Sequence, residues 1–379
     1  MNVLVATGMW PPDVGGPASH APEVCEYLLS RGHRVAAVTM ADRAPAPERY
    51  PVHWASRRAP LVWRQLAAAR LVARLSRNVD IVYSTGMIGR SSLGAALARK
   101  PTVLKLTSDP VFERSLRWRL FGADLGAFQQ ARGLRIGVLR RSRDLALARA
   151  SRVIIPSEAL RELALGWGLP AEKVVVIPNP VSPPPELGER EELRRRHGLE
   201  GRTLVFAGRM VPQKAIPVAL EAVVRNPDVS LVLAGEGPYL ERLQELARSL
   251  PLDGRARFLG PQPRQAVFEL LRAADGALLS SSWENFPHMV VEALSVGTPV
   301  LATDVGGVTE ILRDGENGLL VPMNDPDALA GAIRRYFDDE ALQERLRAAA
   351  VASVERFSPD EIYGRLEALL EEVASAHAS

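Results

Sequence analysis

The chain has 379 residues, of which 47% are hydrophobic and 24% charged, a composition typical of a globular protein with room for two α/β domains. One cysteine, Cys25, excludes an internal disulfide framework and a cysteine-rich metal site, and it favours a reducing, cytoplasmic setting. No stretch reaches the roughly 18 apolar residues of a membrane span, and the first residues lack the features of a signal peptide. We therefore expect a soluble protein.

The net charge of +3 hides an asymmetry between the two halves. Residues 1–180 hold 26 Lys and Arg against 13 Asp and Glu, whereas residues 181–379 hold 21 against 31. Such a division indicates that the halves meet different partners, and the basic half suits phosphates or an anionic membrane surface. The alternative is an arginine-rich composition with solvated faces.

Short apolar runs alternate with helical patterns through the first half. Runs with little alternation are typical of strands buried on both faces, as in a parallel sheet. The predicted strands are residues 3–7, 35–39, 81–84, 102–106, 153–155 and 174–177. Residues 178–185 then hold five prolines in eight positions, which predicts an extended linker and a domain boundary at residue 180.

The same alternation begins again after the linker. The predicted strands are residues 204–207, 230–233, 257–259, 277–279 and 300–302, and helices are expected over 238–249 and 264–273. Two strand–helix series predict two doubly wound, Rossmann-like domains over residues 1–180 and 181–357. A further helix is expected over residues 359–376, with Ser358 as its N-cap, packing back on the first domain.

The segment from Ser281 to Leu294 carries the strongest chemical pattern. It follows an apolar strand and opens a helix near Pro287, so its backbone N–H groups suit a phosphate or sugar hydroxyls. Glu284 falls at the carboxyl end of the strand, where open α/β sheets bind ligands, and Glu292 falls further into the helix. Carboxylates accept hydrogen bonds from adjacent hydroxyls. Taken alone, a Glu that complements the helix dipole and a solvated Glu explain the pattern equally well.

Two glycine-containing turns supply further candidates. Gly208, Arg209 and Lys214 follow the first strand of the second half, where the two cations are placed to bind a pyrophosphate. Gly15 and Gly16 lie between the first strand and the first helix, where backbone can approach a ligand closely. Exposed loop cations and an ordinary glycine-rich turn are the alternatives.

Together these segments resemble the retaining glycosyltransferases of family 4, which have the GT-B fold. The resemblance covers nearly the whole chain and is strongest in the second half. The matching elements are Pro11-Pro12…Gly15-Gly16…His20, Pro178-Asn179, Gly208-Arg209…Lys214, Ala234-Gly235-Glu236-Gly237-Pro238, Glu284-x₇-Glu292, Gly297-Thr298-Pro299-Val300 and Gly306-Gly307…Glu310.

The resemblance implies that the second domain binds a nucleoside-diphosphate sugar and that the first faces the acceptor. It assigns the departing diphosphate to Arg209 and Lys214, and the ribose hydroxyls to Glu292. The remaining donor assignments are Glu284 at the sugar, the backbone of Asn285 and Phe286 beside it, Gly208, Gly15 and Gly16 near the diphosphate, and Glu310 at the donor pocket. The resemblance implies neither a metal ion nor another cofactor.

One position departs from the family pattern. Many members have a histidine after the fourth strand of the first domain, where this chain has Ser108-Asp109-Pro110. Asp109 is therefore the catalytic candidate in that loop, and capping of a turn before Pro110 is an equal alternative. His20 lines the cleft in one interpretation and lies on a helix surface in the other.

Two further patterns have structural alternatives. The spacing of Asp325 and Asp327 fits a metal ligand pair, but N-capping of the following helix explains it better. Residues 112–152 hold ten arginines against three acids, interleaved with apolar residues. This stretch predicts peripheral contact with the inner face of a membrane and a lipid-linked acceptor, although a core-packing helix with a solvated basic face explains it somewhat better.

The sequence thus predicts transfer of a sugar from a UDP- or GDP-linked donor to a hydroxyl of a sugar or lipid-linked acceptor, with retained configuration, as in polysaccharide or glycolipid synthesis. A sugar-nucleotide epimerase or hydrolase is the alternative enzyme. A nucleic-acid-binding protein would use the basic half, but no recognition motif is present, so no nucleic-acid partner is expected. A Rossmann dehydrogenase is a weaker alternative still, because no Gly-x-Gly-x-x-Gly follows the first strand.

Overall fold

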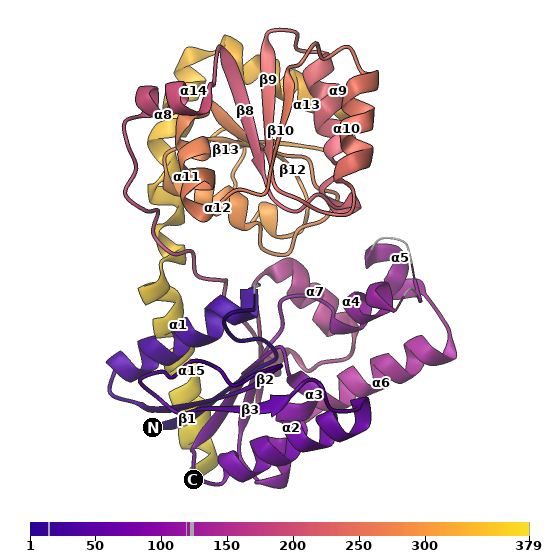
Figure 1. The fold of residues 1–379 in the computed structure, drawn as a ribbon, viewed down its shortest axis with the longest axis vertical. Helices are drawn as coiled ribbons and strands as arrows, with labels where there is room; N and C mark the ends of the chain where they lie inside the picture. Colours follow the sequence, from indigo (N-terminus) through magenta and orange to yellow (C-terminus); the bar gives the residue numbers. More distant parts are fainter. Residues whose placement is uncertain (14–15, 119, 122–124, 379) are drawn as a thin grey trace. The chain divides into compact units, whose positions relative to one another are not determined.

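The computed structural model describes residues 1–13, 16–118, 120–121 and 125–378. The chain forms two compact units (Figure 1). The first unit comprises Met1–Pro156, Leu160–Pro178 and the segment from Asp360 onward. The second comprises Ser157–Ala159 and Asn179–Pro359. The chain therefore passes from the first unit to the second and later returns.

The first unit contains a seven-stranded parallel sheet in the order β3-β2-β1-β4-β5-β6-β7. Its strands are β1 (Asn2–Thr7), β2 (Arg34–Ala41), β3 (Val52–Ser56), β4 (Ile81–Thr85), β5 (Thr102–Lys105), β6 (Arg152–Ile155) and β7 (Val174–Val176). The six predicted strands are present within one or two residues. The sequence pattern did not predict β3, because this edge strand has only one buried residue and no continuous apolar run.

Helices cover both faces of this sheet. They are α1 (Gly16–Ser30), α2 (Leu61–Ser76), α3 (Ile88–Leu97), α4 (Pro110–Arg117), α5 (Leu125–Gln130), α6 (Leu134–Ala148), α7 (Glu158–Gly166) and α15 (Pro359–Ala378), with a 3₁₀ turn η1 (Ala171–Lys173). Val3 and Val5 of β1 pack with α1 and α15, whereas Leu4 and Ala6 pack with α2. This alternation along β1 is that of a strand buried on both faces.

The second unit contains a six-stranded parallel sheet in the order β10-β9-β8-β11-β12-β13. Its strands are β8 (Arg202–Ala207), β9 (Val229–Ala234), β10 (Ala256–Gly260), β11 (Gly276–Leu279), β12 (Val300–Thr303) and β13 (Gly318–Val321). The five predicted strands are present. The missed strand, β13, again lies at an edge of the sheet.

The helices of the second unit follow its strands in alternation. They are α8 (Arg190–His197), α9 (Ile216–Val224), α10 (Leu240–Ser249), α11 (Arg264–Ala273), α12 (His288–Ser295), α13 (Pro326–Asp338) and α14 (Glu340–Ala350), with 3₁₀ turns η2 (Pro212–Lys214), η3 (Gly306–Val308) and η4 (Ala352–Phe357). The carboxylate of Asp325 accepts a hydrogen bond from the Ala328 N–H at 2.8 Å, so the predicted N-cap of α13 is confirmed. Asp327 pairs with Arg225 at 2.7 Å.

Each sheet has a switch point, where neighbouring strands are not consecutive and their following helices leave toward opposite faces. The switch lies between β1 and β4 in the first unit and between β8 and β11 in the second. Open α/β sheets bind ligands at the carboxyl ends of such strand pairs. Two doubly wound parallel sheets confirm the predicted fold class. Among the described residues, the helices are all too short or too polar to cross a membrane.

Candidate active site

The second unit brings its predicted site residues to the β8/β11 switch point. Arg209 and Lys214 follow β8, and Glu284 follows β11, its neighbour in the sheet. Because the two strands are parallel, the loops that follow them leave the same edge of the sheet. The two segments that the sequence singled out separately therefore share one site.

Lys214 and Glu284 form an ion pair at this edge. The Lys214 ammonium donates to Oε1 of Glu284 at 2.5 Å, and the Ser281 hydroxyl donates to the same oxygen at 2.5 Å. The two side chains are 18% and 7% exposed. A partly desolvated pair of this kind interacts more strongly than an exposed one, and removal of one partner leaves the other without compensation.

Backbone contacts hold the two loops together independently of this ion pair. The Ser282 N–H donates to the Gln213 carbonyl at 2.8 Å, and the Gln213 side-chain amide donates to the Trp283 carbonyl at 2.6 Å. The Ser280 hydroxyl donates to the Lys214 carbonyl at 3.0 Å. The backbone of Lys214 is thus held in place by contacts that do not involve its ammonium.

Arg209 is exposed, and its guanidinium makes no hydrogen bond or ion pair with any residue that the structure describes. The backbone on either side is fixed, since the Gly208 N–H donates to the Ala234 carbonyl at 2.9 Å. A Cβ at Gly235 would lie 1.9 Å from the Gly208 carbonyl oxygen, so only glycine allows this approach. The result is an unpaired guanidinium on a rigid turn, which suits binding of an anion.

Two glycines of η3 closely contact the backbone of the segment that carries Glu284. The Gly307 N–H donates to the Glu284 carbonyl at 2.9 Å. A Cβ at Gly307 would lie 1.9 Å from the Asn285 carbonyl oxygen, and one at Gly306, where φ is +49°, would lie 2.0 Å from the Glu284 carbonyl oxygen. The Gly306-Gly307 pair therefore sets the path of the candidate donor loop.

Glu292 lies in α12 and is half-buried. Its carboxylate forms neither a hydrogen bond nor an ion pair with the described residues. Burial raises the pKa of Glu292, and the charge of Arg264 opposes that rise. A partly desolvated carboxylate without a protein donor is the arrangement expected of one that receives hydroxyl groups from a ligand.

The other donor-side residues are occupied by protein contacts. Asn285 is buried, and its side-chain oxygen accepts from the Ser157 hydroxyl at 2.6 Å. Phe286 is buried, with its ring edge-on to His288 and Phe357. A carboxylate oxygen of Glu310 accepts from the Ala159 N–H at 3.1 Å. Contacts within the second unit therefore hold the side chains of Asn285 and Phe286 in place.

The first unit places its candidates at a separate edge. Gly16 is the first residue of α1, directly after the β1 loop, whereas Gly15 lies outside the described residues. His20, one turn into α1, contacts the Tyr83 hydroxyl at 2.8 Å, and Tyr83 belongs to β4. His20 is therefore next to the β1/β4 switch point.

Asp109 is fully buried and engaged by its own unit. Its carboxylate caps α4 by accepting from the Val111 N–H at 2.9 Å, and it pairs with Arg143 of α6 at 3.2 Å. The Gln129 amide donates to its second oxygen at 3.3 Å. Capping, the alternative that the sequence left open, is thus present, together with a buried ion pair that the sequence did not reveal.

Lys105 is a residue that the sequence patterns missed. It is the last residue of β5, only 4% exposed, and among the described residues nothing accepts a hydrogen bond from its ammonium. Burial lowers the pKa of Lys105 to about 7. A lysine at the carboxyl end of a sheet strand with such a shift is a functional candidate, and the lone polar residue in an apolar run was its only sequence signal.

This shift predicts the pH dependence of Lys105→Met. The folded state resists protonation of Lys105, so the cost to stability is complete below pH 7 and vanishes above the ordinary lysine pKa of 10.5. We therefore expect the variant to be more stable than the parent by a few kcal/mol below pH 7, with the difference closing as the pH rises toward 10.5. Urea unfolding across this range measures it, and a pH-independent difference would contradict the burial argument.

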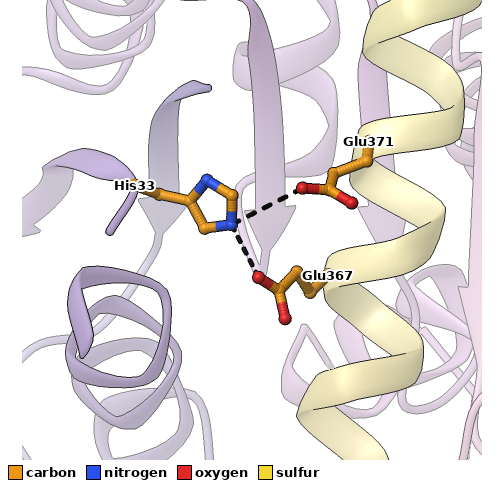
Figure 2. A group of neighbouring side chains, drawn as sticks. All are labelled: His33, Glu367 and Glu371. Atoms are coloured by element: carbon orange, nitrogen blue, oxygen red, sulfur yellow. Dashed lines mark hydrogen bonds and ion pairs between the residues drawn. The ribbon is translucent and has the colours of Figure 1, made fainter. Parts of the chain in front are cut away.

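One cluster among the described residues has the residue types of a metal site. Ligand atoms of His33, Glu367 and Glu371 lie within 4.8 Å of one another (Figure 2). His33 Nε2 is 2.7 Å from Glu367 and 3.9 Å from Glu371, and Arg31 reaches the second oxygen of Glu367 at 3.2 Å. These contacts join α15 to the turn before β2, which is a structural role.

Comparison with known protein families gives two adjoining matches. Residues 15–180 match the model described as "Glycosyl transferase 4-like domain", and residues 189–352 match "Glycosyl transferases group 1". The boundary between the matches falls in the proline-rich linker. Together they cover the second sheet, all strands of the first sheet except β1, and the predicted site residues discussed above.

Relatives of known sequence include two that align over nearly the whole chain. An uncharacterised glycosyltransferase of Methanocaldococcus jannaschii is 26% identical, and the match covers 96% of each chain. A phosphatidyl-myo-inositol mannosyltransferase of Mycobacterium tuberculosis is 28% identical over 96% of this chain and 95% of its own length. Other relatives are matched only in part: the chain spans 23% of an exopolysaccharide phosphotransferase of Streptomyces coelicolor, to which it is 35% identical over 59% of its own length.

Solved structures show the same fold. Anabaena HepE, determined in complex with UDP and glucose, superimposes with a TM-score of 0.77 at 21% identity, covering 98% of this chain and 100% of HepE. Sucrose-phosphate synthase of Thermosynechococcus elongatus gives a TM-score of 0.79 at 20% identity, covering 99% of each chain. Two doubly wound sheets, two family matches and full-length relatives converge on one conclusion: the chain is an enzyme that belongs to the family 4 type of glycosyltransferases, with the GT-B fold.

Proposed function

We propose that the chain transfers a sugar, with retained anomeric configuration, from a UDP- or GDP-linked donor to a hydroxyl of a sugar or lipid-linked acceptor. The observation that supports this most is the arrangement at the β8/β11 switch point, where unpaired Arg209 shares an edge with the Lys214–Glu284 pair. Arg209 and Lys214 bind the diphosphate, Glu284 contacts the sugar, and Glu292 holds the ribose. Glu310 assists at the donor pocket.

In this proposal the protein supplies charge where the reaction generates it. As the bond from the sugar to the diphosphate breaks, negative charge grows on the leaving oxygens, and cations already in position stabilise it. The leaving phosphate takes the proton of the acceptor hydroxyl, so no protein base is required. Asp109, which binds Arg143 and the α4 N-terminus, positions the acceptor side in place of the missing histidine. Neither a metal ion nor another cofactor takes part.

The names of two similar proteins support the substrate classes. HepE was crystallised with UDP and glucose, and the full-length mycobacterial relative is a mannosyltransferase that acts on phosphatidyl-myo-inositol. A nucleotide-sugar donor and a hydroxyl acceptor are therefore the first substrates to test.

The test is a screen of UDP- and GDP-sugars for thermal stabilisation, followed by turnover of the best donor with and without acceptors. A ligand that binds the folded state alone raises the melting temperature by mass action. Acceptor-dependent release of the nucleoside diphosphate, with an α-linked product by NMR from an α-linked donor, is expected. Equal release without acceptor indicates a hydrolase, and an inverted product contradicts the retaining mechanism.

Replacement of Glu292 by alanine is expected to weaken donor binding about tenfold to a hundredfold, because two ribose hydroxyls lose their acceptor. The turnover number at saturating donor changes much less, since the ribose does not take part in the reaction. Titration of the donor nucleotide measures the effect. Glu344→Ala, an exposed α14 position, is the control, and parental affinity in Glu292→Ala would contradict the ribose assignment.

We also propose that residues 112–152 contact the cytoplasmic face of a membrane peripherally. Bulky apolar side chains there are exposed among the arginines, namely Leu116, Trp118, Leu134, Val138 and Leu145. Basic surfaces with exposed apolar side chains bind anionic lipid. Flotation with phosphatidylglycerol vesicles tests this proposal: Leu134→Ser with Val138→Ser is expected to reduce binding, and Met323→Ser, at an exposed apolar position of the second unit, is the control.

A further inference from the structure

A cavity of about 530 Å³ lies in the first unit. It is lined by α2, the Gly86–Met87 turn after β4, the start of α3, α4 and α6. Four arginines line it, and no acidic side chain appears among its described lining residues; the arginines are Arg64, Arg90, Arg114 and Arg143. They come from four different elements, so their convergence is a property of the fold.

The positive charge of this cavity is only partly compensated by the protein. Arg143 pairs with Asp109 at 3.2 Å and with Asp144 at 2.9 Å. Arg64 donates to the Arg57 carbonyl at 3.2 Å, and Arg90 donates to the Met40 sulfur. Neither Arg64 nor Arg90 forms an ion pair with any acid in the described part of the chain.

The nearby positive charges change the pKa of Arg90. Burial and then the charges of Arg114 and Arg64 lower the pKa of Arg90 to about 10. A guanidinium that is both desolvated and repelled by like charges is unfavourable unless an anion reaches it. Phosphate oxygens match a group of guanidinium donors in charge and in geometry.

The cavity lies beside the switch point of the first sheet. Gly86, which lines it, follows β4, and its neighbour across the switch is Gly8, which follows β1: a Cβ at Gly86 would lie 3.4 Å from the Gly8 N atom. Trp118, 53% exposed, also lines the cavity and lies against Arg114. The site thus combines buried Arg143 and half-buried Arg64 and Arg90 with an aromatic side chain open to solvent.

We infer that this cavity binds the phosphate or pyrophosphate group of the acceptor, so that the acceptor substrate is a phosphate ester. Arg64, Arg90 and Arg114 contact the phosphate oxygens, and Trp118 contacts the attached sugar or lipid. The assignment of this phosphate to the acceptor rests on the proposed function, whereas the anion site itself is inferred from the arginines alone.

Titration with inorganic pyrophosphate tests the anion site. The full chain carries Arg209→Ala and Lys214→Ala, so that the proposed donor site does not bind the probe. Adding Arg64→Gln and Arg90→Gln is expected to weaken pyrophosphate binding about tenfold or more by calorimetry, since two charge-assisted contacts are lost. Arg74→Gln, an exposed arginine further along α2, is the matched control and leaves the affinity unchanged.

Unchanged affinity in the Arg64→Gln, Arg90→Gln chain overturns the inference. Exposed Arg114→Gln is a second variant that keeps the fold, and it must weaken pyrophosphate binding as well. The nucleotide-sugar screen on the same pocket variants, with Arg209 and Lys214 intact, separates the two proposals. If nucleotide-sugars do not stabilise the parent chain, the proposed function is contradicted. If they still stabilise the pocket variants while pyrophosphate binding by those variants is weakened, both proposals are supported.

The source of the phosphate is distinguished by competition. Phosphatidylcholine vesicles with and without phosphatidic acid are offered to the chain, with inorganic pyrophosphate as the competitor. Vesicle binding that needs phosphatidic acid and falls with pyrophosphate in the parent, but not in the pocket variant, assigns a lipid headgroup. Pyrophosphate binding without such competition assigns a water-soluble phosphate ester.

Discussion

Replacement of Lys214 by alanine is expected to slow sugar transfer about a hundredfold to a thousandfold while donor affinity falls far less. The ammonium acts on charge that appears only as the diphosphate leaves, so its loss raises the barrier more than it weakens the ground state. Single-turnover rates at saturating donor and donor titrations measure the two effects separately.

The same change tests the partner of Lys214. Glu284 would be left buried with only the Ser281 hydroxyl as a donor, so Lys214→Ala is also expected to lower the free energy of unfolding. Lys214→Ala combined with Glu284→Gln is the control, because it removes the orphaned charge and restores stability but not transfer. A parental transfer rate in Lys214→Ala would remove Lys214 from the mechanism.

The second large effect is expected from Gly307→Val. Its Cβ would lie 1.9 Å from the Asn285 carbonyl oxygen, a distance at which one backbone segment must move. The movement displaces the Glu284 segment, so we expect loss of donor binding together with destabilisation by about 2–4 kcal/mol. Thermal unfolding with and without the donor nucleotide measures both.

Gly331→Ala is the matched control for this prediction. Gly331 lies inside α13, where an added Cβ meets only the end of the Arg334 side chain at 3.9 Å. Alanine is the better helix former, so this variant gains up to about 1 kcal/mol. If Gly307→Val kept parental donor binding, the contact between η3 and the donor loop would not be what shapes the site.

The fold class could be predicted from the sequence because both sheets are parallel and buried on both faces. Their inner strands are continuous apolar runs, as β8 and β11 are, whereas the edge strand β3 lacks that pattern. The edge strand β13 has the pattern at the same four-residue length as β11, and it was missed all the same. The sequence identified Gly208, Arg209 and Lys214 as candidate site residues because they lie within a few residues of one another along the chain.

Side chains that only the fold brings together could not be predicted from the sequence to be neighbours. The four cavity arginines come from separate elements, and nothing near Arg64 in the sequence indicates that Arg114 lies close to it. The pairing of Asp109 with Arg143 likewise depends on α4 and α6 packing together. The environment of Lys105 depends on its neighbouring strands and helices, so its lowered pKa could not be predicted from sequence spacing.

The return of α15 to the first unit has a consequence for synthesis. Ile362, Leu366 and Leu370 are core residues of the first unit, yet the ribosome makes them after all of residues 179–359. An N-terminal domain usually folds first as the chain emerges. Here the side of the first sheet that packs against α1 and α15 lacks the α15 part of its core until the whole second unit has been translated. We therefore expect the second unit to be the first to fold fully on the ribosome.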